Sequence, residues 1–315
     1  CGIGLKLMEA LAIKNNYNIE DVYSLLDLVA IAIGADIVPI TGENRVLAYY
    51  GLKQIAKTPR LGIKTMLELA NKKGEITISD LVFTVAPRIN AAGRIDSARN
   101  AVELLLSENK ADANSWGDIV NKYNSERKEI DKDITTEALR LIKEDTSFLD
   151  KKSTVISNAQ WHKGVVGIVA SRIIENYYKP TIVLVESEGM ASGSARSVKG
   201  FDVYEAINEC AHLLDRFGGH KYAAGLSLKL ENLDQFKTEF EVAVKNKITK
   251  EQETRVLRID GELNELDFES DSAESNFPKF YRLLKQMAPF GPQNMTPVFI
   301  LKNLVDAGFS KIVGE

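Results

Sequence analysis

Residues 154–185 read TVISNAQWHKGVVGIVASRIIENYYKPTIVLV, and this stretch decides the fold class. It begins and ends with short apolar runs rich in β-branched residues, at 154–156 and 181–185, and such runs predict strands. Residues 165–177 lie between the two runs and predict a helix. A strand, a helix and a second strand in this order favour parallel pairing of the strands. The stretch therefore predicts an α/β domain.

This domain is expected to cover residues 152–250. Its further predicted elements are strands near 191–197 and 223–230 and helices at 203–214 and 233–246. Residues 251–315 then predict a small β-rich domain that is incomplete at its end. Its predicted elements are strands at 255–259, 298–300 and 304–309 and a helix at 280–287.

Residues 1–106 carry apolar residues at helical spacing and predict a mostly helical region. Gly-containing turns are expected at 34–36 and 91–94. Between 107 and 151 charge is dense and strong turn signals are missing, which predicts one long solvated helix at 108–146 that connects two domains. The fold class expected for the whole chain is α/β.

Composition excludes several classes of protein. The chain has 315 residues, with 40 Lys and Arg against 44 Asp and Glu, so any contact with nucleic acid must use a local patch. The two cysteines, Cys1 and Cys210, exclude a disulfide framework and a zinc site built from four thiolates. The most apolar early stretch, residues 25–40, is too short and too charged to span a bilayer. We expect a cytoplasmic protein without a membrane anchor. Because the chain opens at Cys1, we expect it to be a piece of a larger protein.

Asp36 lies between apolar residues, in the sequence IGADIVP. We expect its carboxylate at the edge of a core, where a charge is costly unless something pairs with it. An arginine, a helix N-terminus or a divalent cation could do so. From the residues alone an ion pair or a cap is favoured, because structural carboxylates outnumber metal ligands.

Arg88 and Asn90 lie in the sequence PRINAAGR, residues 87–94. The small residues between its two arginines leave guanidinium and backbone groups accessible, and such a turn could grip a phosphate. A helix-terminating loop with solvated arginines explains the pattern equally well.

Trp161 and His162 follow the strand predicted at 154–156 and precede a helix. Ligands collect at the carboxyl ends of strands in open α/β sheets, so both side chains are candidates for binding. The alternative makes Trp161 a core anchor and His162 a cap.

Ser194 and Arg196 lie in ASGSARS, residues 191–197, where small side chains let a ligand approach the backbone. Hydroxyl and guanidinium groups can donate to phosphate oxygens. A tight strand against a neighbouring layer would have the same composition. His220 follows two glycines; it could donate to a phosphate or could simply be a turn residue.

Taken in order, several segments resemble the RecJ family of the DHH phosphoesterase superfamily. They are residues 27–30, 35–39, 41–45, 87–94, 161–172, 193–197, 218–225 and 289–292. The resemblance implies a 5′-to-3′ single-stranded-DNA-specific exonuclease of DNA repair and recombination that depends on Mn²⁺ or Mg²⁺. It implies single-stranded DNA as substrate, a single-strand-binding protein or a helicase as partner, and a monomer.

The resemblance also implies an architecture. Residues 1–106 would be the C-terminal part of a DHH catalytic domain and 107–151 a connecting helix. Residues 152–250 would be a DHHA1 domain that binds substrate, and 251–315 an incomplete OB-fold-like domain.

Residue roles follow in the same way. Asp36 would be a catalytic, metal-binding aspartate. Arg88, with Asn90 beside it, would face the active cleft. The side chains expected to hold the DNA end and its phosphates are Ser194, Arg196 and His220, with Trp161 and His162 on a less certain part of the same surface.

The chain departs from the family pattern in one respect. The Asp-His-His signature is absent, because the three histidines are His162, His212 and His220. A two-metal site needs several carboxylate and imidazole ligands, so Asp36 alone cannot build one. We therefore expect this chain to be inactive by itself. The alternatives are a phosphodiesterase of the same superfamily acting on short oligonucleotides or cyclic dinucleotides, and a non-catalytic single-strand-binding module.

Overall fold

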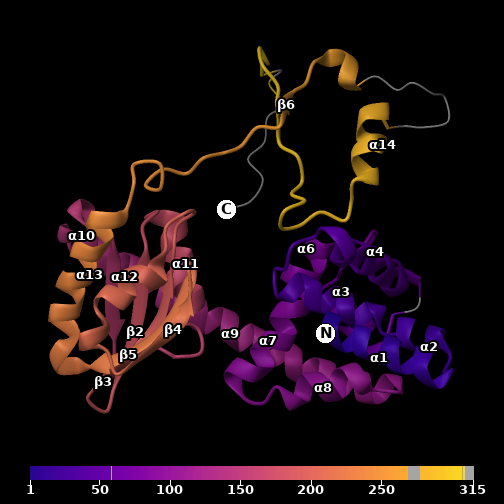
Figure 1. The fold of residues 1–315 in the computed structure, drawn as a ribbon, viewed down its shortest axis with the longest axis horizontal. Helices are drawn as coiled ribbons and strands as arrows, with labels where there is room; N and C mark the ends of the chain where they lie inside the picture. Colours follow the sequence, from indigo (N-terminus) through magenta and orange to yellow (C-terminus); the bar gives the residue numbers. More distant parts are fainter. Residues whose placement is uncertain (58, 269–276, 307, 309–315) are drawn as a thin grey trace. The chain divides into compact units, whose positions relative to one another are not determined.

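The computed structural model describes residues 1–57, 59–268, 277–306 and 308 (Figure 1). The chain divides into two compact units. Unit 1 comprises Cys1–Ile89, Ala101–Gly117 and Leu257–Glu315, and unit 2 comprises Asn90–Asn100 and Asp118–Val256. Both cysteines are free thiols. In the part of the chain that is described, no helix is both long and apolar enough to cross a membrane.

Unit 2 is built on a five-stranded sheet with the order β1-β2-β3-β5-β4. Its strands are β1 (Thr154–Asn158), β2 (Thr181–Ser187), β3 (Met190–Arg196), β4 (Arg216–His220) and β5 (Ala223–Lys229). β1 and β2 are parallel neighbours, and α11 (Val166–Asn176) connects them. This confirms the predicted strand-helix-strand unit. The remaining pairs are antiparallel.

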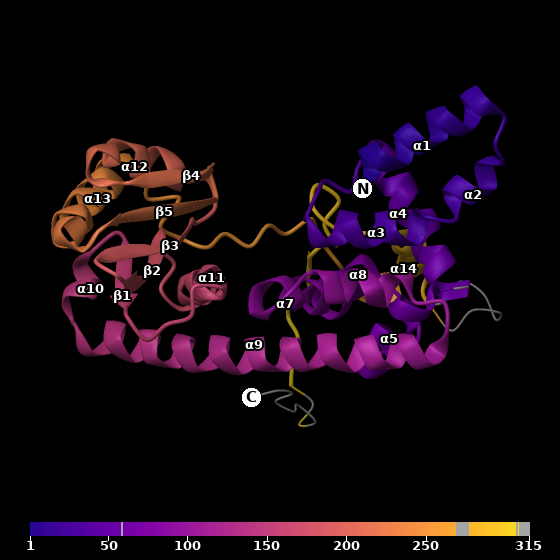
Figure 2. The same cartoon turned by 90° about the horizontal axis from the view of Figure 1, so that it is seen from below.

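Helices cover this sheet on both faces (Figure 2). α12 (Val203–Glu209) and α13 (Leu233–Lys247) pack on one face over a cluster of buried side chains that includes Phe201, Phe236 and Phe240. α11 and the end of α9 (Lys110–Glu144) pack on the other face over Trp161 and Ile173. α11 contacts β2 and β3, so β4 and β5 are left uncovered on this second face. Short elements complete the unit: α10 (Ser147–Asp150), η2 (Ala211–Leu213) and η3 (Leu230–Asn232).

β4 was not predicted from the sequence, because two glycines interrupt it. Gly219 adopts φ 155°, and a Cβ there would lie 2.3 Å from the carbonyl oxygen of Ala223. A side chain is also excluded at Gly193 in β3, since a Cβ there would lie 2.0 Å from the oxygen of Val183. Both glycines are therefore required by close backbone approach within the sheet.

Unit 1 is helical, as predicted. Its elements are α1 (Gly2–Asn15), α2 (Ile19–Tyr23), α3 (Leu26–Ala35), α4 (Gly42–Lys57), α5 (Leu61–Leu69), α6 (Ile78–Asp80), the π-helix η1 (Leu81–Val85), the start of α7 (Ala86–Ile95), α8 (Arg99–Leu106) and the start of α9. α3 forms the centre of the unit and is buried along most of its length. α4 packs directly on it, since a Cβ at Gly51 would lie 2.3 Å from the oxygen of Leu26.

The long helix expected at 108–146 is confirmed as α9. The turn expected at 91–94 is wrong, because α7 continues through these residues. Ala91 and Ala92 are fully buried there, so the small side chains serve helix packing instead of ending the helix.

The C-terminal part of unit 1 holds α14 (Lys279–Gln286), which matches the predicted helix, and η4 (Glu265–Phe268). Its described strands, β6 (Gly261–Glu262) and β7 (Phe299–Ile300), form a short parallel pair. The strand predicted at 255–259 is wrong; these residues have no regular structure. Residues 304–306 are not a strand either, and 307 and 309 lie outside the described residues. The OB-fold assignment stays a prediction.

Candidate functional site

Ser194 and Arg196 lie on the face of β3 that α12 and α13 do not cover. Side chains alternate along a strand, and Ala191 and Ala195 point into the cluster beneath α12 and α13. Ser194 and Arg196 therefore point to the opposite face, toward α11. The predicted strand near 191–197 is thus confirmed, and it presents both candidate side chains on one surface.

The Arg196 guanidinium is positioned by its own strand. Its Nη1 donates to Ser194 Oγ at 2.7 Å and to the carbonyl oxygen of Ala195 at 2.8 Å. Burial, and then the charge of nearby Arg94, lower the pKa of Arg196 below its ordinary value. No described carboxylate forms an ion pair with either arginine. A partly buried guanidinium that feels the charge of a second arginine and has no described carboxylate partner favours a negatively charged ligand.

The first turn of α11 completes this site. Gly167 lies so close that a Cβ there would be 2.6 Å from Arg196 Nη2 and 3.2 Å from Ser194 Oγ. The N-cap residue Val165 supplies no side-chain hydrogen bond to the helix. Helix N-termini attract anions through their backbone amides and dipole, so α11 adds to the attraction of the two arginines.

His162 and Arg94 hold the loop that enters α11. The Nη1 atom of Arg94 donates to the carbonyl oxygen of Gly164 at 3.0 Å, and the Gly164 amide donates to His162 Nδ1 at 3.1 Å. His162 is exposed. Its imidazole accepts a bond in the turn before α11, close to the cap considered as an alternative, although the N-cap residue itself is Val165.

His220 lies at the same end of the sheet. The register pairs it with Ala223 on β5, and Ala223 with Arg196 on β3. Paired residues share a face, so His220 and Arg196 lie on one surface about 10 Å apart, two strand spacings. His220 is exposed, and the Tyr222 amide donates to its Nδ1 at 3.3 Å.

The floor between these side chains is bare backbone. Ser194 pairs with Gly225, and Gly225 pairs with Gly218. A Cβ at Gly218 would meet no described atom within 4 Å, and one at Gly225 would meet only the oxygen of Gly193, at 3.8 Å. Unlike Gly193 and Gly219, these two glycines are not required by packing. A ligand that lies against the backbone would explain them.

Gly225→Ala is therefore expected to raise stability and weaken binding. A strand position with an ordinary φ gains about 0.4–1 kcal/mol from Gly→Ala through the unfolded state. The added methyl group stands on the floor of the site, so affinity for a 5′-phosphorylated oligonucleotide should fall. Thermal unfolding and fluorescence anisotropy measure the two effects. Gly4→Ala, at another open glycine in α1, is the matched control and should leave binding unchanged. Unchanged binding by Gly225→Ala would contradict the role of this floor.

Trp161 is a core residue. Its side chain is 4% exposed, and its Nε1 donates to Glu137 Oε2 at 2.8 Å. A direct contact between this ring and a substrate, as predicted from the resemblance, is not compatible with its burial. The alternative of a core anchor is the one that the structure supports.

Arg88 and Asn90 lie on α7, directly after the π-helix η1. Arg88 is 7% exposed, its Nη1 donates to the oxygen of Thr84 at 2.7 Å, and burial lowers its pKa. It is not the solvated arginine of a loop. Asn90 is exposed on the same helix. π-Helical turns are often found at functional sites. A role for Arg88 in binding stays a prediction.

Asp36 follows the last residue of α3 and is exposed, not held at the edge of a core as expected. Its neighbour Ile37 adopts a left-handed φ of 54°, which is strained for a β-branched residue. No described cation pairs with the carboxylate, so the ion pair favoured from the residues is wrong. Asp36 borders a cavity of about 520 Å³ that is also lined by Lys6 and Glu43.

These residues do not fit a metal site by themselves. Within the described ranges no group of three or more His, Cys, Asp or Glu could hold a metal ion. Lys6 pairs with Glu43 at 2.5 Å, so the second carboxylate of the cavity is already neutralised. Asp36 can supply one ligand, and the others of a two-metal site are not among the described residues.

Comparison with known proteins agrees with this geometry. Residues 150–246, which carry the sheet, Ser194, Arg196 and α11, match the family model of the DHHA1 domain. The chain is 37% identical over 292 residues to the single-stranded-DNA-specific exonuclease RecJ of Bacillus subtilis, with 91% of the chain matched. It is 36% identical over 316 residues to RecJ of Haemophilus influenzae, with 95% matched. The chain is a homologue of RecJ.

The solved structures of RecJ agree. RecJ from Thermus thermophilus in complex with Mg²⁺ matches 93% of the chain with a TM-score of 0.80 and 28% identity, and the Mn²⁺ complex matches 94% with a TM-score of 0.81. The chain spans 36% of the Bacillus RecJ, 54% of the Haemophilus RecJ and 44% of the Thermus RecJ chain with Mg²⁺.

Two features of the site were not predicted from the sequence. Arg94 lies in the quoted segment PRINAAGR, but only Arg88 and Asn90 of that segment were selected. The turn expected at 91–94 hid the signal: on the helix that is found there, two arginines six positions apart cannot share one face, so they can serve different sites. The open floor at Gly218 and Gly225 requires strand register, which a sequence does not give.

Proposed function

We propose that this chain is part of a RecJ-type nuclease that hydrolyses single-stranded DNA from its 5′ end with the help of Mn²⁺ or Mg²⁺. The observation that carries the proposal is the anion site of unit 2. Arg196 lies there next to Ser194 and the first turn of α11, feels the charge of Arg94, and has no described carboxylate partner. Such a site suits a phosphate group of a nucleic acid.

The roles of the side chains follow from their geometry. Arg196 and Ser194 donate to phosphate oxygens, and Arg94 adds charge without a direct bond. His220 contacts the ligand at the other edge of the floor. The glycines let the sugar-phosphate chain lie against the sheet. Phosphate contacts of this kind position a strand without reading its sequence, which fits a nuclease that acts on any single strand.

We propose further that Asp36 is one ligand of the divalent cations, with the remaining ligands supplied by residues beyond this chain. Bound metal would supply an activated water and charge neutralisation at the scissile phosphate. The domain bounds 1–106, 107–151, 152–250 and 251–315 are proposed as DHH, connecting helix, DHHA1 and OB-fold-like parts. A cytoplasmic monomer that works with a single-strand-binding protein or a helicase is part of the same proposal.

The test compares an oligonucleotide with a 5′-phosphate and the same oligonucleotide with a 5′-hydroxyl, in EDTA. Charge-assisted hydrogen bonds predict about tenfold tighter binding of the phosphorylated end by fluorescence anisotropy. With Mn²⁺ added, a denaturing gel should show no cleavage by this chain. Equal affinity for the two ends would contradict the phosphate site. Cleavage by the purified chain would contradict the assignment of the missing ligands.

A further inference from the structure

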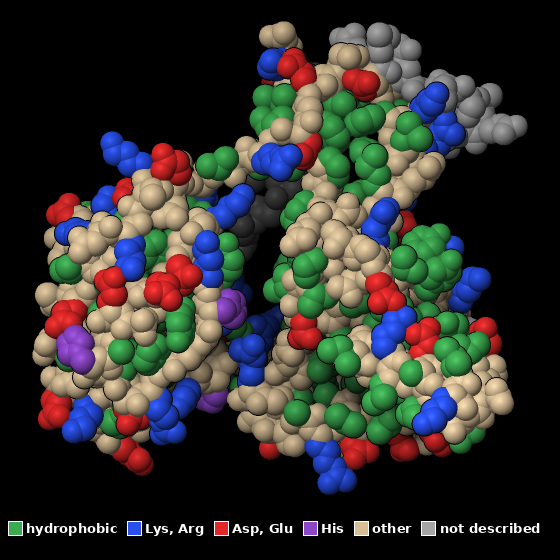
Figure 3. Space-filling model, in the orientation of Figure 1, with side chains coloured by type: hydrophobic (Ala, Val, Ile, Leu, Met, Phe, Trp, Pro, Cys, Tyr) green, Lys and Arg blue, Asp and Glu red, His purple; other side chains and the backbone are tan. Residues whose placement is uncertain are grey.

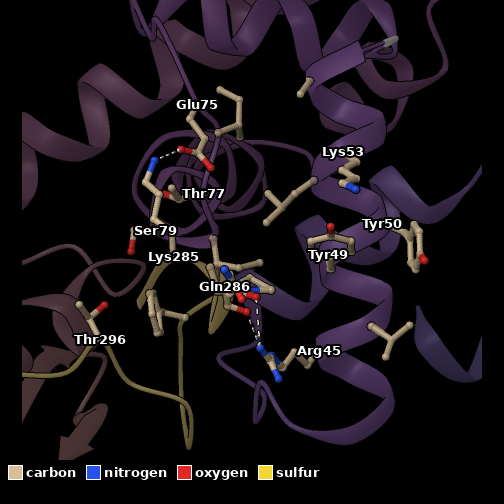
Figure 4. A pocket seen from close by; sticks show the side chains of 18 of the residues that line it. Arg45, Tyr49, Tyr50, Lys53, Glu75, Thr77, Ser79, Lys285, Gln286 and Thr296 are labelled. Atoms are coloured by element: carbon tan, nitrogen blue, oxygen red, sulfur yellow. Dashed lines mark hydrogen bonds and ion pairs between the residues drawn. The ribbon is translucent and has the colours of Figure 1, made fainter. Parts of the chain in front are cut away.

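A groove on unit 1 lies outside the sites described above. It has a volume of about 1030 Å³ and runs between α4, the loop before α6 and the segment that follows α14 (Figure 4). This volume is at the upper end of the range of small-molecule sites. In Figure 4, Tyr49 lies on the side of α4 that faces Gln286, with Lys53 above it and Arg45 below.

The charge of the groove is positive, although the chain carries a net charge of -4. Its charged lining residues are Arg45, Lys53 and Lys285 against one carboxylate, Glu75. Lys285 pairs with Glu75 at 3.0 Å. Arg45 donates to the backbone oxygen of Met287 at 2.8 Å, and neither Arg45 nor Lys53 has a carboxylate partner among the described residues. The groove therefore complements an anion.

The same wall carries exposed aromatic rings. Tyr49 is 42% and Tyr50 54% exposed, and the two rings meet edge to face at 5.3 Å. The Lys53 ammonium lies 4.4 Å from the Tyr49 ring centroid. Hydrophobic side chains gather over α4 in Figure 3, with Lys or Arg side chains beside them. Exposed aromatic rings next to cations that have no carboxylate partner are the pattern by which proteins hold single-stranded nucleic acid.

We propose that this groove is a second contact site for single-stranded DNA, with a base stacked near Tyr49 and phosphates held by Lys53 and Arg45. The inference rests on the proposed function and adds a binding site to it. An acidic peptide has the same charge, but it has no flat base to cover the exposed rings, so nucleic acid is favoured.

The experiment uses the full chain carrying Arg196→Ala, so that binding no longer depends on the anion site of unit 2. The probe is a 5′-hydroxyl oligodeoxythymidine of about 20 nucleotides, long enough to cover one binding site. Tyr49→Ala should weaken its binding about fivefold to tenfold, the loss expected for one stacked base. Lys53→Ala should reduce the slope of log affinity against log salt by about 0.7.

Matched controls are Tyr17→Ala and Lys14→Ala, which remove exposed side chains of unit 1 outside the groove. Both should leave affinity unchanged. Circular dichroism should show that all variants fold. An oligonucleotide with 5-iododeoxyuridine should crosslink to the tryptic peptide 46–53, which contains Tyr49 and Tyr50.

Crosslinks confined to other peptides, with unchanged affinity of Tyr49→Ala, would overturn the groove while leaving the anion site intact. Capture of an acidic peptide with no effect on DNA would also overturn it and assign the groove to a protein partner. Equal affinity for the 5′-phosphate and 5′-hydroxyl oligonucleotides, with crosslinks still at 46–53, would overturn the proposed phosphate site alone.

Discussion

Asp131→Ala is expected to lower the free energy of unfolding of unit 2 by about 3–5 kcal/mol. Asp131 lies on α9 and is completely buried. Arg172 of α11 donates to both of its carboxylate oxygens, at 3.1 and 3.0 Å through Nε. Arg127 Nη1 lies 3.8 Å away. Removing the carboxylate leaves two neighbouring arginines without their shared partner, and Arg127 is already held at a lowered pKa, chiefly by burial.

The measurement is urea unfolding followed by tryptophan fluorescence. The chain has two tryptophans, so a Trp116→Phe background leaves Trp161 as the reporter of unit 2. Asp133→Ala is the control, an exposed aspartate on the same helix, and should change stability by no more than about 0.5 kcal/mol. Replacing Asp131, Arg127 and Arg172 together by apolar residues should recover much of the lost free energy of unfolding. A loss below about 1 kcal/mol for Asp131→Ala would show that the ion pairs do not hold α9 to α11.

Arg196→Ala is expected to weaken binding of a 5′-phosphorylated oligonucleotide about 10- to 100-fold, the loss of charge-assisted hydrogen bonds. Stability should not fall. Among the described residues, the Arg196 guanidinium bonds only to Ser194 Oγ and the Ala195 oxygen, its charge is partly desolvated, and Arg94 repels it. If Arg196→Ala abolishes binding and leaves stability unchanged or higher, the role of Arg196 is in binding and not in folding.

Anisotropy with the 5′-phosphate and 5′-hydroxyl oligonucleotides measures this loss, which should appear mainly with the phosphate. Arg196→Lys should restore only part of the affinity, because a lysine cannot reproduce the planar guanidinium fork. Arg140→Ala, an exposed arginine on α9, is the control and should bind like the parent chain. If Arg140→Ala and Arg196→Ala lost affinity equally, general charge and not this site would account for the binding.

Much of the fold could be predicted from hydrophobic pattern. The strand-helix-strand unit, α9 and α13 were found because a buried face repeats there at a regular period. β4 was missed because Gly218 and Gly219 carry no pattern, and the supposed turn at 91–94 is helix because two buried alanines pack there. Small residues are ambiguous in a sequence, since packing against a neighbour and approach by a ligand require the same composition.

The candidate site was predicted in part. Ser194, Arg196 and His220 share one face of the sheet, which agrees with their selection. Trp161 was selected by its place after a strand, yet the ring turns inward to Glu137. Asp36 was expected at a core edge from its apolar neighbours, but α3 ends there and leaves the carboxylate exposed. Side-chain direction at the end of an element depends on the tertiary neighbours, which local sequence does not contain.

The position of β4 at the margin of the sheet has a consequence for association between copies of this protein. An edge strand offers its unpaired amides and carbonyls to any extended chain, and long flat edge strands lead to aggregation. β4 is only five residues long, has two glycines, and carries Arg216 and His220 at its two ends. The glycines of β4 therefore also make this edge strand a poor partner for another chain. Replacing them by valines would be expected to turn the binding surface into a starting point for fibre formation.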